Sequence, residues 1–413
     1  MNYEKPSAQN IRRKNRSEIL RNIYFHSDIS RLEVSDQLGI SPATVTNIVA
    51  ELIEKKILVE TGIRRSESGR PSTLLAINAD YGKIIGMEVG ETFIRGELFD
   101  LAFNLNGKYE FAFSNDQVTE QNIVEEIIRC VKTLTTVANV KESEVLGIGI
   151  GFPGLVDPVK GLSIFTPNWG WHNVSITKQL AGHLAAPIYI DNGAKLMAVG
   201  ELLFGAGRGL SHFVVLLMGT GIGSGIIANG KLFRGSSNNA GEFGHTTINP
   251  TGPLCRCGNY GCMEVYLGAP GIISRYQQLS QSVLPHNGND QIESIKQIII
   301  LSENGDHVAE QIIEETIEYL GICIANIINS INPDQVLIGG WSGLLFGQRF
   351  LTKIESVVAK HALEESLSKT TLRLCQLGQD AVLKGAAGLV LQHFFESNGD
   401  IEDVIIGGKA IDV

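Results

Sequence analysis

Three of the chain's six cysteines, Cys255, Cys257 and Cys262, lie close together, and His245 shortly precedes them. Thiolate sulfur and imidazole nitrogen are the ligands that Zn²⁺ prefers, and a Cys₃His set fills its tetrahedral coordination with no open position. We therefore predict a structural zinc site in a short, glycine-rich loop. The alternative is that free cysteines cluster by chance. The other three cysteines stand singly in apolar runs and are expected in the core.

Two carboxylates flank the predicted metal ligands. Glu242 lies three residues before His245, and Glu264 follows the last cysteine. Carboxylate and imidazole groups can hold sugar hydroxyls, because each accepts and orients hydrogen bonds. His245 has two ring nitrogens, so one can bind zinc while the other contacts a hydroxyl. These residues predict a sugar site beside the metal.

The N-terminal region has the pattern of a DNA-binding module. An amphipathic, cationic helix with Ile11 on its apolar face is expected over residues 10–25, and two short helices hinged at Gly39 follow over residues 30–49. Ser30 and Ser41 are plausible N-caps. The second short helix leaves polar residues outside that suit base edges or phosphates. These candidate DNA contacts are Ser41, Thr44, Thr46 and Asn47.

Two β runs around a basic turn come next and predict a wing. The run 57–62 precedes the turn, and residues 74–77 follow it. Arg70, in a Gly-Arg-Pro sequence, could place a guanidinium in a minor groove, although a plain linker is the alternative. The first 75 residues carry more Lys and Arg than Asp and Glu, whereas the whole chain has a formal net charge of −10. A basic head on an acidic body favours DNA contact, and a generic regulatory domain with a solvated basic face is the other interpretation.

The rest of the chain alternates strands, glycine turns and helices, which predicts an α/β body. The pattern of one half echoes the other, so we expect two related lobes with a cleft between them. The predicted domains are a winged helix-turn-helix over residues 1–78, a first lobe over 79–200, a second lobe over 201–395 and a mobile tail over 396–413. The second lobe is expected to carry the zinc loop and a dimerisation surface.

Two segments of this body carry a resemblance to a known family. Residues 242–245 read Glu-Phe-Gly-His, and residues 255–264 read Cys-Arg-Cys-Gly-Asn-Tyr-Gly-Cys-Met-Glu. They resemble the signatures of the ROK family (repressors, open reading frames and kinases), which includes repressors of xylose and N-acetylglucosamine operons. The resemblance extends over essentially the whole chain and implies a ribonuclease-H-like body of the actin and hexokinase type. By resemblance, Asn168 and Asn192 match further sugar-contacting positions, although each also suits an ordinary turn.

The chain departs from the pattern of the family's kinases. Their catalytic base is the Asp of an Asn-Asp pair, and counting back from Gly200-Glu201 puts that position at Gly193. Asp191 would lie about 6 to 7 Å away along an extended segment. Glu91 places a negative charge in the first phosphate turn, whereas the glycine turn 219–225 still suits a phosphate. We therefore expect no kinase activity.

Composition narrows the remaining choices. The longest apolar runs are far shorter than the roughly 18 residues that span a bilayer, and no apolar segment follows the basic N-terminus. We expect a cytoplasmic, sugar-responsive repressor that binds operator DNA as a homodimer or tetramer, with a monosaccharide or sugar phosphate as effector and a structural Zn²⁺. The alternatives are a bifunctional sugar kinase that keeps its DNA-binding head, and a co-regulator that docks on a phosphotransferase protein without sensing sugar.

Overall fold

The computed structural model describes residues 7–65, 71–113, 118–281 and 291–399. It divides into two compact units. Among the described residues, the first unit takes those within 7–150, 175–189 and 387–399, and the second takes those within 151–174 and 190–386. The predicted domain boundaries at residues 78 and 200 stay predictions, and residues 400–413 of the predicted tail lie outside the described residues. No helix in the described ranges is long and apolar enough to cross a membrane.

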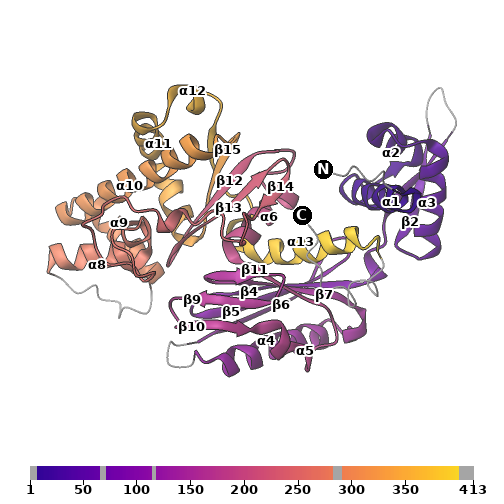
Figure 1. Ribbon diagram of the computed structural model, residues 1–413, viewed down its shortest axis with the longest axis horizontal. Coiled ribbons are helices and arrows are strands. Elements are labelled where there is room, and N and C mark those ends of the chain that lie inside the picture. The colour runs from indigo at the N-terminus through magenta and orange to yellow at the C-terminus, as the bar shows by residue number, and fades with distance from the viewer. Residues whose placement is uncertain (1–6, 66–70, 114–117, 282–290, 400–413) are drawn as a thin grey trace. The chain divides into compact units, whose positions relative to one another are not determined.

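The head of the first unit is a winged helix-turn-helix, drawn in indigo in Figure 1. Its elements are α1 (Ala8–Phe25), β1 (Ile29–Ser30), α2 (Arg31–Leu38), α3 (Pro42–Glu54), β2 (Leu58–Arg64) and β3 (Ser72–Ile77). Ser30 caps α2 in a reciprocal capping box with Glu33, and α2 ends at Gly39 in the left-handed conformation. Ser41 caps α3. The predicted helices, hinge and caps are therefore confirmed.

The head has its own apolar core. The buried face of α3 is formed by Val45, Ile48, Val49 and Leu52, as the helical spacing predicts. β3 pairs with both β1 and β2, so the predicted wing is an antiparallel hairpin joined to a third short strand. The expected apolar face of α1 needs one correction. Ile11 is 48% exposed, because it lies in the first turn of α1, away from the three isoleucine and leucine residues farther along that helix that are buried.

The larger sheet of the first unit has the strand order β11-β7-β4-β5-β6. These strands are β4 (Lys83–Val89), β5 (Phe93–Asp100), β6 (Leu105–Ala112), β7 (Val145–Phe152) and β11 (Ile188–Asn192). α4 (Glu120–Val137) packs against β5 and β6, and α5 (Ile176–Ala181) contacts α4. The short 3₁₀ helices η1 (Ala79–Tyr81) and η3 (Glu142–Glu144) precede β4 and β7.

The second unit is built on a sheet of the order β14-β13-β12-β15-β16. These strands are β12 (Phe213–Met218), β13 (Ile222–Ala228), β14 (Lys231–Phe233), β15 (Gln335–Gly339) and β16 (Thr371–Leu374). The order repeats that of the first unit: three successive strands side by side, followed by two strands that arrive after a helix-containing crossover. This repetition confirms the predicted relation between the halves, and it is the strand order of a ribonuclease-H-like fold.

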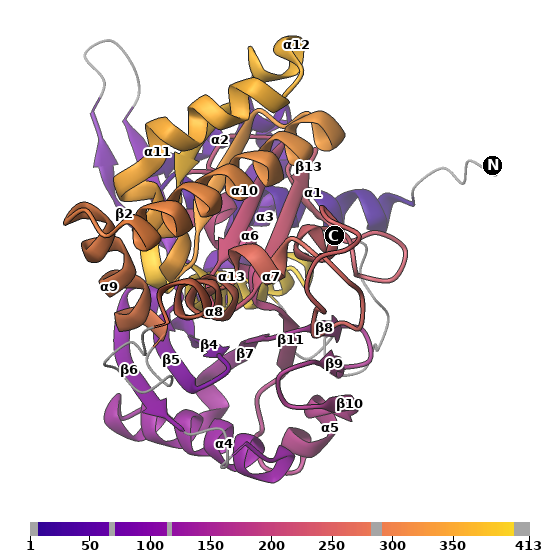
Figure 2. The ribbon, with the colours of Figure 1, turned by 90° about the vertical axis from the view of Figure 1, so that its left-hand side faces the viewer.

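Helices surround this second sheet, and α10 and α11 run side by side, as Figure 2 shows. The helices are α6 (Gly193–Phe204), α7 (Glu264–Leu267), α8 (Ala269–Ser280), α9 (Gln291–Glu303), α10 (His307–Ile331), α11 (Trp341–His361) and α12 (Glu364–Leu367), with η4 (Phe243–His245) and η5 (Gly378–Asp380). α6 packs on β12 and β13. A separate small sheet consists of β8 (Leu155–Asp157), β9 (Leu162–Thr166) and β10 (Trp171–Ser175).

The last helix, α13 (Ala381–Glu396), ends against the head within the first unit. The ring of Phe395 lies 5.2 Å from that of Tyr24 and 6.2 Å from that of Phe25, both on α1. Tyr81 donates a hydrogen bond of 3.1 Å from its hydroxyl to the carbonyl oxygen of Gly399. Burial raises the pKa of Tyr24 well above its usual range. Phe395, on α13, therefore completes an aromatic cluster with the DNA-binding head.

Candidate functional site

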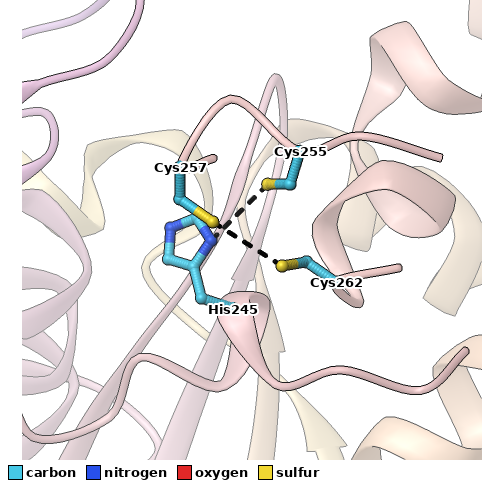
Figure 3. Close-up of side chains that lie close together, drawn as sticks. All are labelled: His245, Cys255, Cys257 and Cys262. Carbon is cyan, nitrogen blue, oxygen red and sulfur yellow. Dashed lines mark hydrogen bonds between the residues drawn. The ribbon is translucent and has the colours of Figure 1, made fainter. Parts of the chain in front are cut away.

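His245 and the three clustered cysteines meet in the second unit. Their four ligand atoms all lie within 4.8 Å of one another, and Figure 3 shows the side chains converging. Nδ1 of His245 is 3.7 Å from Sγ of Cys255, and Sγ of Cys257 is 3.7 Å from Sγ of Cys262. A disulfide would need a separation of about 2.05 Å. The cluster therefore consists of four separate donors that face a common point.

These spacings fit zinc. Bonds of about 2.3 Å to sulfur and about 2.0 Å to nitrogen, arranged as a tetrahedron, put neighbouring ligand atoms about 3.5 to 3.8 Å apart. The backbone of the cysteine loop, residues 255–262, is shaped for this. Gly258 and Gly261 both have positive φ, and a Cβ on Gly261 would overlap the carbonyl oxygen of Asn249. The structure confirms the predicted tight turn of this loop and its dependence on glycine. Its donor set suits a structural Zn²⁺.

The two predicted carboxylates lie close to this cluster but in different surroundings. Glu264 accepts a hydrogen bond of 3.1 Å from the backbone N–H of Ile222, and its other oxygen is 3.6 Å from the guanidinium of Arg256. Glu242 immediately precedes η4, and its side chain is 30% exposed. Burial raises the pKa of Glu242, and the neighbouring ammonium of Lys195 opposes that rise. Glu242 is thus the more open of the two carboxylates.

The two predicted asparagines occupy different positions. Asn192 caps α6, because its Oδ1 accepts from the N–H groups of Ala194 and Lys195, and its Nδ2 donates to the carbonyl of Gly154. Much of its hydrogen-bonding capacity is therefore used to hold the start of α6. Asn168 lies half-buried in the turn between β9 and β10. The sugar-contacting role of Asn168 stays a prediction.

Lys195 is a residue of this site that sequence reasoning missed. It lies in the first turn of α6 with its side chain only 2% exposed, and its Nζ is 3.8 Å from Oε1 of Glu242. Burial lowers the pKa of Lys195, while the charges of Glu242 and Asp191 raise it. The available signal was a lysine near the start of an otherwise apolar helical run, two residues after the position of the missing base.

The position predicted for a kinase base, Gly193, has space for a side chain, and the nearby Asp191 makes several contacts of its own. A Cβ added at Gly193 would meet no atom closer than 3.8 Å. Asp191 is completely buried and accepts hydrogen bonds from the guanidinium of Arg234 at 2.5 Å, from the N–H of Asn192 at 2.8 Å and from the amide of Asn238 at 3.3 Å. The carboxylate of Asp191 is therefore engaged in one ion pair and two further hydrogen bonds.

The two glycine turns expected around a nucleotide phosphate also make internal contacts. In the turn between β12 and β13, Gly219 donates its N–H to the carbonyl of Gly221, and Ile222 donates to Glu264. A Cβ on Gly219 would lie 3.1 Å from Nε1 of Trp341. In the first unit, the ring of Phe93 similarly lies against Gly90. Part of the backbone N–H capacity that would hold phosphate is therefore already used.

The candidate DNA contacts lie at the start of α3 and on its exposed face. Ser41 and Thr44 bond to each other, and the hydroxyl of Thr46 donates to the carbonyl of Pro42 at 2.8 Å. Asn47 is exposed one turn farther along the helix. Arg70 lies outside the described residues. Asn47 is therefore the best placed of these residues to offer a complete amide to a base.

Comparison with known proteins agrees with both parts of this architecture. The ROK family model matches residues 84–393, and the winged helix-turn-helix DNA-binding model matches residues 12–59. A xylose repressor of Caldicellulosiruptor bescii is 32% identical over 391 residues, covering 92% of this chain and 96% of the repressor. A glucokinase of Halalkalibacterium halodurans is 30% identical over 75% of this chain and 95% of the kinase.

A solved structure extends the likeness to the fold of the whole molecule. The crystal structure of a ROK family transcriptional regulator, described as a homologue of the Escherichia coli Mlc protein, superimposes with a TM-score of 0.79 at 24% identity and covers 96% of this chain and 100% of its own. The chain therefore belongs to the ROK family, as a member whose sugar-kinase-like body follows a winged helix-turn-helix DNA-binding domain.

Proposed function

We propose that this ROK protein is a sugar-responsive transcriptional repressor of a carbohydrate-utilisation operon, with a body that binds a monosaccharide or sugar phosphate without phosphorylating it. One contrast within the second unit carries the proposal. Glu242 remains open beside the metal donor set, whereas Gly193 supplies no base and Asp191 is held by Arg234. The groups that suit hydroxyl binding are present, and the group that would start phosphoryl transfer is not.

The relatives support the same assignment. The xylose repressor aligns over nearly the full length of this chain, including the head. Two copies of the head are needed to read a two-fold operator, so we propose a homodimer or tetramer in the cytoplasm, where the operator DNA is.

The structural Zn²⁺ would be held by His245, Cys255, Cys257 and Cys262 and would fix the loop next to Glu242. For induction, the effector must bind the form that releases DNA more tightly than the form that binds it.

The proposal is tested by linking DNA release to sugar binding. An operator is selected from random duplexes, and its affinity is measured by fluorescence anisotropy with D-xylose, D-glucose, N-acetyl-D-glucosamine or their phosphates. One of these is expected to weaken operator binding and to raise the melting temperature by mass action. Glu242→Ala should keep operator affinity and lose the response, whereas Glu355→Ala, an exposed change on α11, should keep both. A panel with no effect on DNA binding or stability would refute the sugar-sensing role.

The absence of kinase activity has its own test. We expect the unaltered protein to show only background ATP consumption with any sugar that binds, because loss of a general base costs a factor of about 10² to 10⁴ in rate. Gly193→Asp restores a carboxylate at a position with space for it. A coupled kinase assay compares the two proteins. Activity that appears only in the variant supports the proposal, and robust turnover by the unaltered protein contradicts it.

A further inference from the structure

Lys195 is a buried cation, and the packing of α6 alone does not explain why a charged side chain occupies this position. It lies on α6, where the neighbouring residues Ala194, Leu196 and Met197 are apolar and buried. An ammonium group loses hydration when it is buried, and this costs free energy unless a charge or hydrogen bond compensates. The compensation must come from the polar groups that surround its Nζ.

The charges around Lys195 form two pairs. Arg234 is bound to Asp191 at 2.5 Å, so the charge of Asp191 is largely matched by that guanidinium. The partner of Lys195 is Glu242, at 3.8 Å. The net charge of Lys195, Glu242, Asp191 and Arg234 together is zero. An anionic ligand would therefore find no unpaired cation among them. This balance favours a neutral ligand.

The pair of Lys195 and Glu242 is also loose. A separation of 3.8 Å is longer than a normal N–H···O hydrogen bond, and an ammonium has three donors. The ammonium can therefore donate to a further acceptor. A hydroxyl placed between the two groups would accept a hydrogen bond from the ammonium and donate a hydrogen bond to the carboxylate. Charge-assisted hydrogen bonds of this kind are about twice as strong as neutral ones.

We propose that Lys195 is a specificity-determining residue of the effector site, and that it donates a hydrogen bond to one hydroxyl of a neutral monosaccharide whose own O–H is accepted by Glu242. This inference rests on the proposed function and deepens it, because it names the effector class and the contact that selects it. The side chain contacts the hydroxyl on one carbon of the sugar. Its contribution to affinity must therefore differ between sugars that differ at that carbon.

The test compares Lys195→Met with the unaltered protein. Calorimetry measures the affinities of D-xylose, D-glucose and N-acetyl-D-glucosamine, each with its monodeoxy analogues, and of D-glucuronate and D-glucose 6-phosphate. Lys231→Met, which removes an exposed lysine from β14, is the matched control. Thermal unfolding and the metal content of each variant are recorded alongside.

Lys195→Met is expected to weaken binding of the cognate sugar by about 10- to 150-fold, the range for a hydrogen bond to a charged group. One deoxy analogue, lacking the hydroxyl that Lys195 reads, should bind the variant and the unaltered protein equally. An equal loss for the parent sugar and every analogue would mean that Lys195 only supports the fold, and this overturns the proposal. So does tighter binding of glucuronate or glucose 6-phosphate than of any neutral sugar. If none of these ligands binds the unaltered protein, the proposed sugar-sensing function fails as well.

Discussion

Asn47 differs from the other polar residues of the DNA-binding face because their side chains form hydrogen bonds within the head. Ser41 and Thr44 are bonded together at the helix cap, and Thr46 donates to its own helix. Asn47→Ala should therefore lower specific operator affinity by about 1 to 3 kcal/mol, the cost of losing a base-edge contact. Ser41→Ala should instead lower stability by about 1 kcal/mol through loss of the cap.

The two effects separate in one measurement. Each variant is titrated against the selected operator and against a random duplex of the same length at the same salt concentration. Asn47→Ala is expected to reduce the ratio of the two affinities, and Ser41→Ala to lower the melting temperature. Equal weakening of both duplexes by Asn47→Ala would show that Asn47 contacts the phosphate backbone only.

At this scale, sequence reasoning worked where the deciding neighbours are close in the chain. The N-caps Ser30 and Ser41 could be predicted because a cap bonds to backbone two or three residues away. The metal donors could be predicted because three of them share one short loop. The hydrogen bonds of Asp191 could not be predicted, because Arg234 and Asn238 contact it from a loop that is distant in the sequence. Lys195 was missed for the same reason, since its partner Glu242 is 47 residues away, on another segment.

The cysteine loop is the element whose stability depends most directly on a ligand. Its contacts include backbone bonds such as that from Cys255 N–H to the carbonyl of Asn259 at 2.7 Å, but it has no regular helix or strand of its own among the described residues. We expect one zinc per chain, and Cys257→Ser should lose the metal and lower the melting temperature, because metal-binding free energy is folding free energy in such loops.

Elemental analysis and thermal unfolding, with and without a chelator, check this expectation. Asn259→Ser changes an exposed residue of the same loop and should keep both the metal and the melting temperature. Cys257→Ser protein that retains a full equivalent of zinc would contradict the assignment of this ligand. A metal-free unaltered chain with the same stability would contradict the site as a whole.

Among larger elements, the repeated strand pattern predicted two related halves, and the matching orders of the two five-stranded sheets confirm it. Long buried strands such as β7 and β12 are visible as apolar runs. The small sheet of β8, β9 and β10 was not predicted. Its strands are three to five residues long, and their pairing depends on turns that carry little periodicity.

At the scale of the molecule, the contact of α13 with the head links two ends of the sequence. Phe395 is 2% exposed and stacks edge-on against Tyr24. Phe395→Ala should cost about 3 to 5 kcal/mol of stability, the usual cost of removing a buried Phe ring. It should also weaken operator binding, because α1 loses a neighbour. Gln392→Ala, on a less buried face of α13, should change neither.

Denaturant unfolding and operator titration of both variants provide the measurement. Unchanged stability in Phe395→Ala would show that the aromatic cluster contributes nothing to the fold. Lower stability with full operator affinity would show that the head binds DNA independently of its contact with α13.

The same contact has a consequence for the order in which the protein is made. The head is synthesised first, and domains generally fold from the N-terminus as the chain emerges from the ribosome. Its partner Phe395 lies on α13, after the whole second unit, so the aromatic cluster forms only once that unit has been synthesised. A chain cut short in translation would carry a head without this support. If the contact supports operator binding, as Phe395→Ala tests, the head is expected to gain that support only after the chain has been synthesised through Phe395.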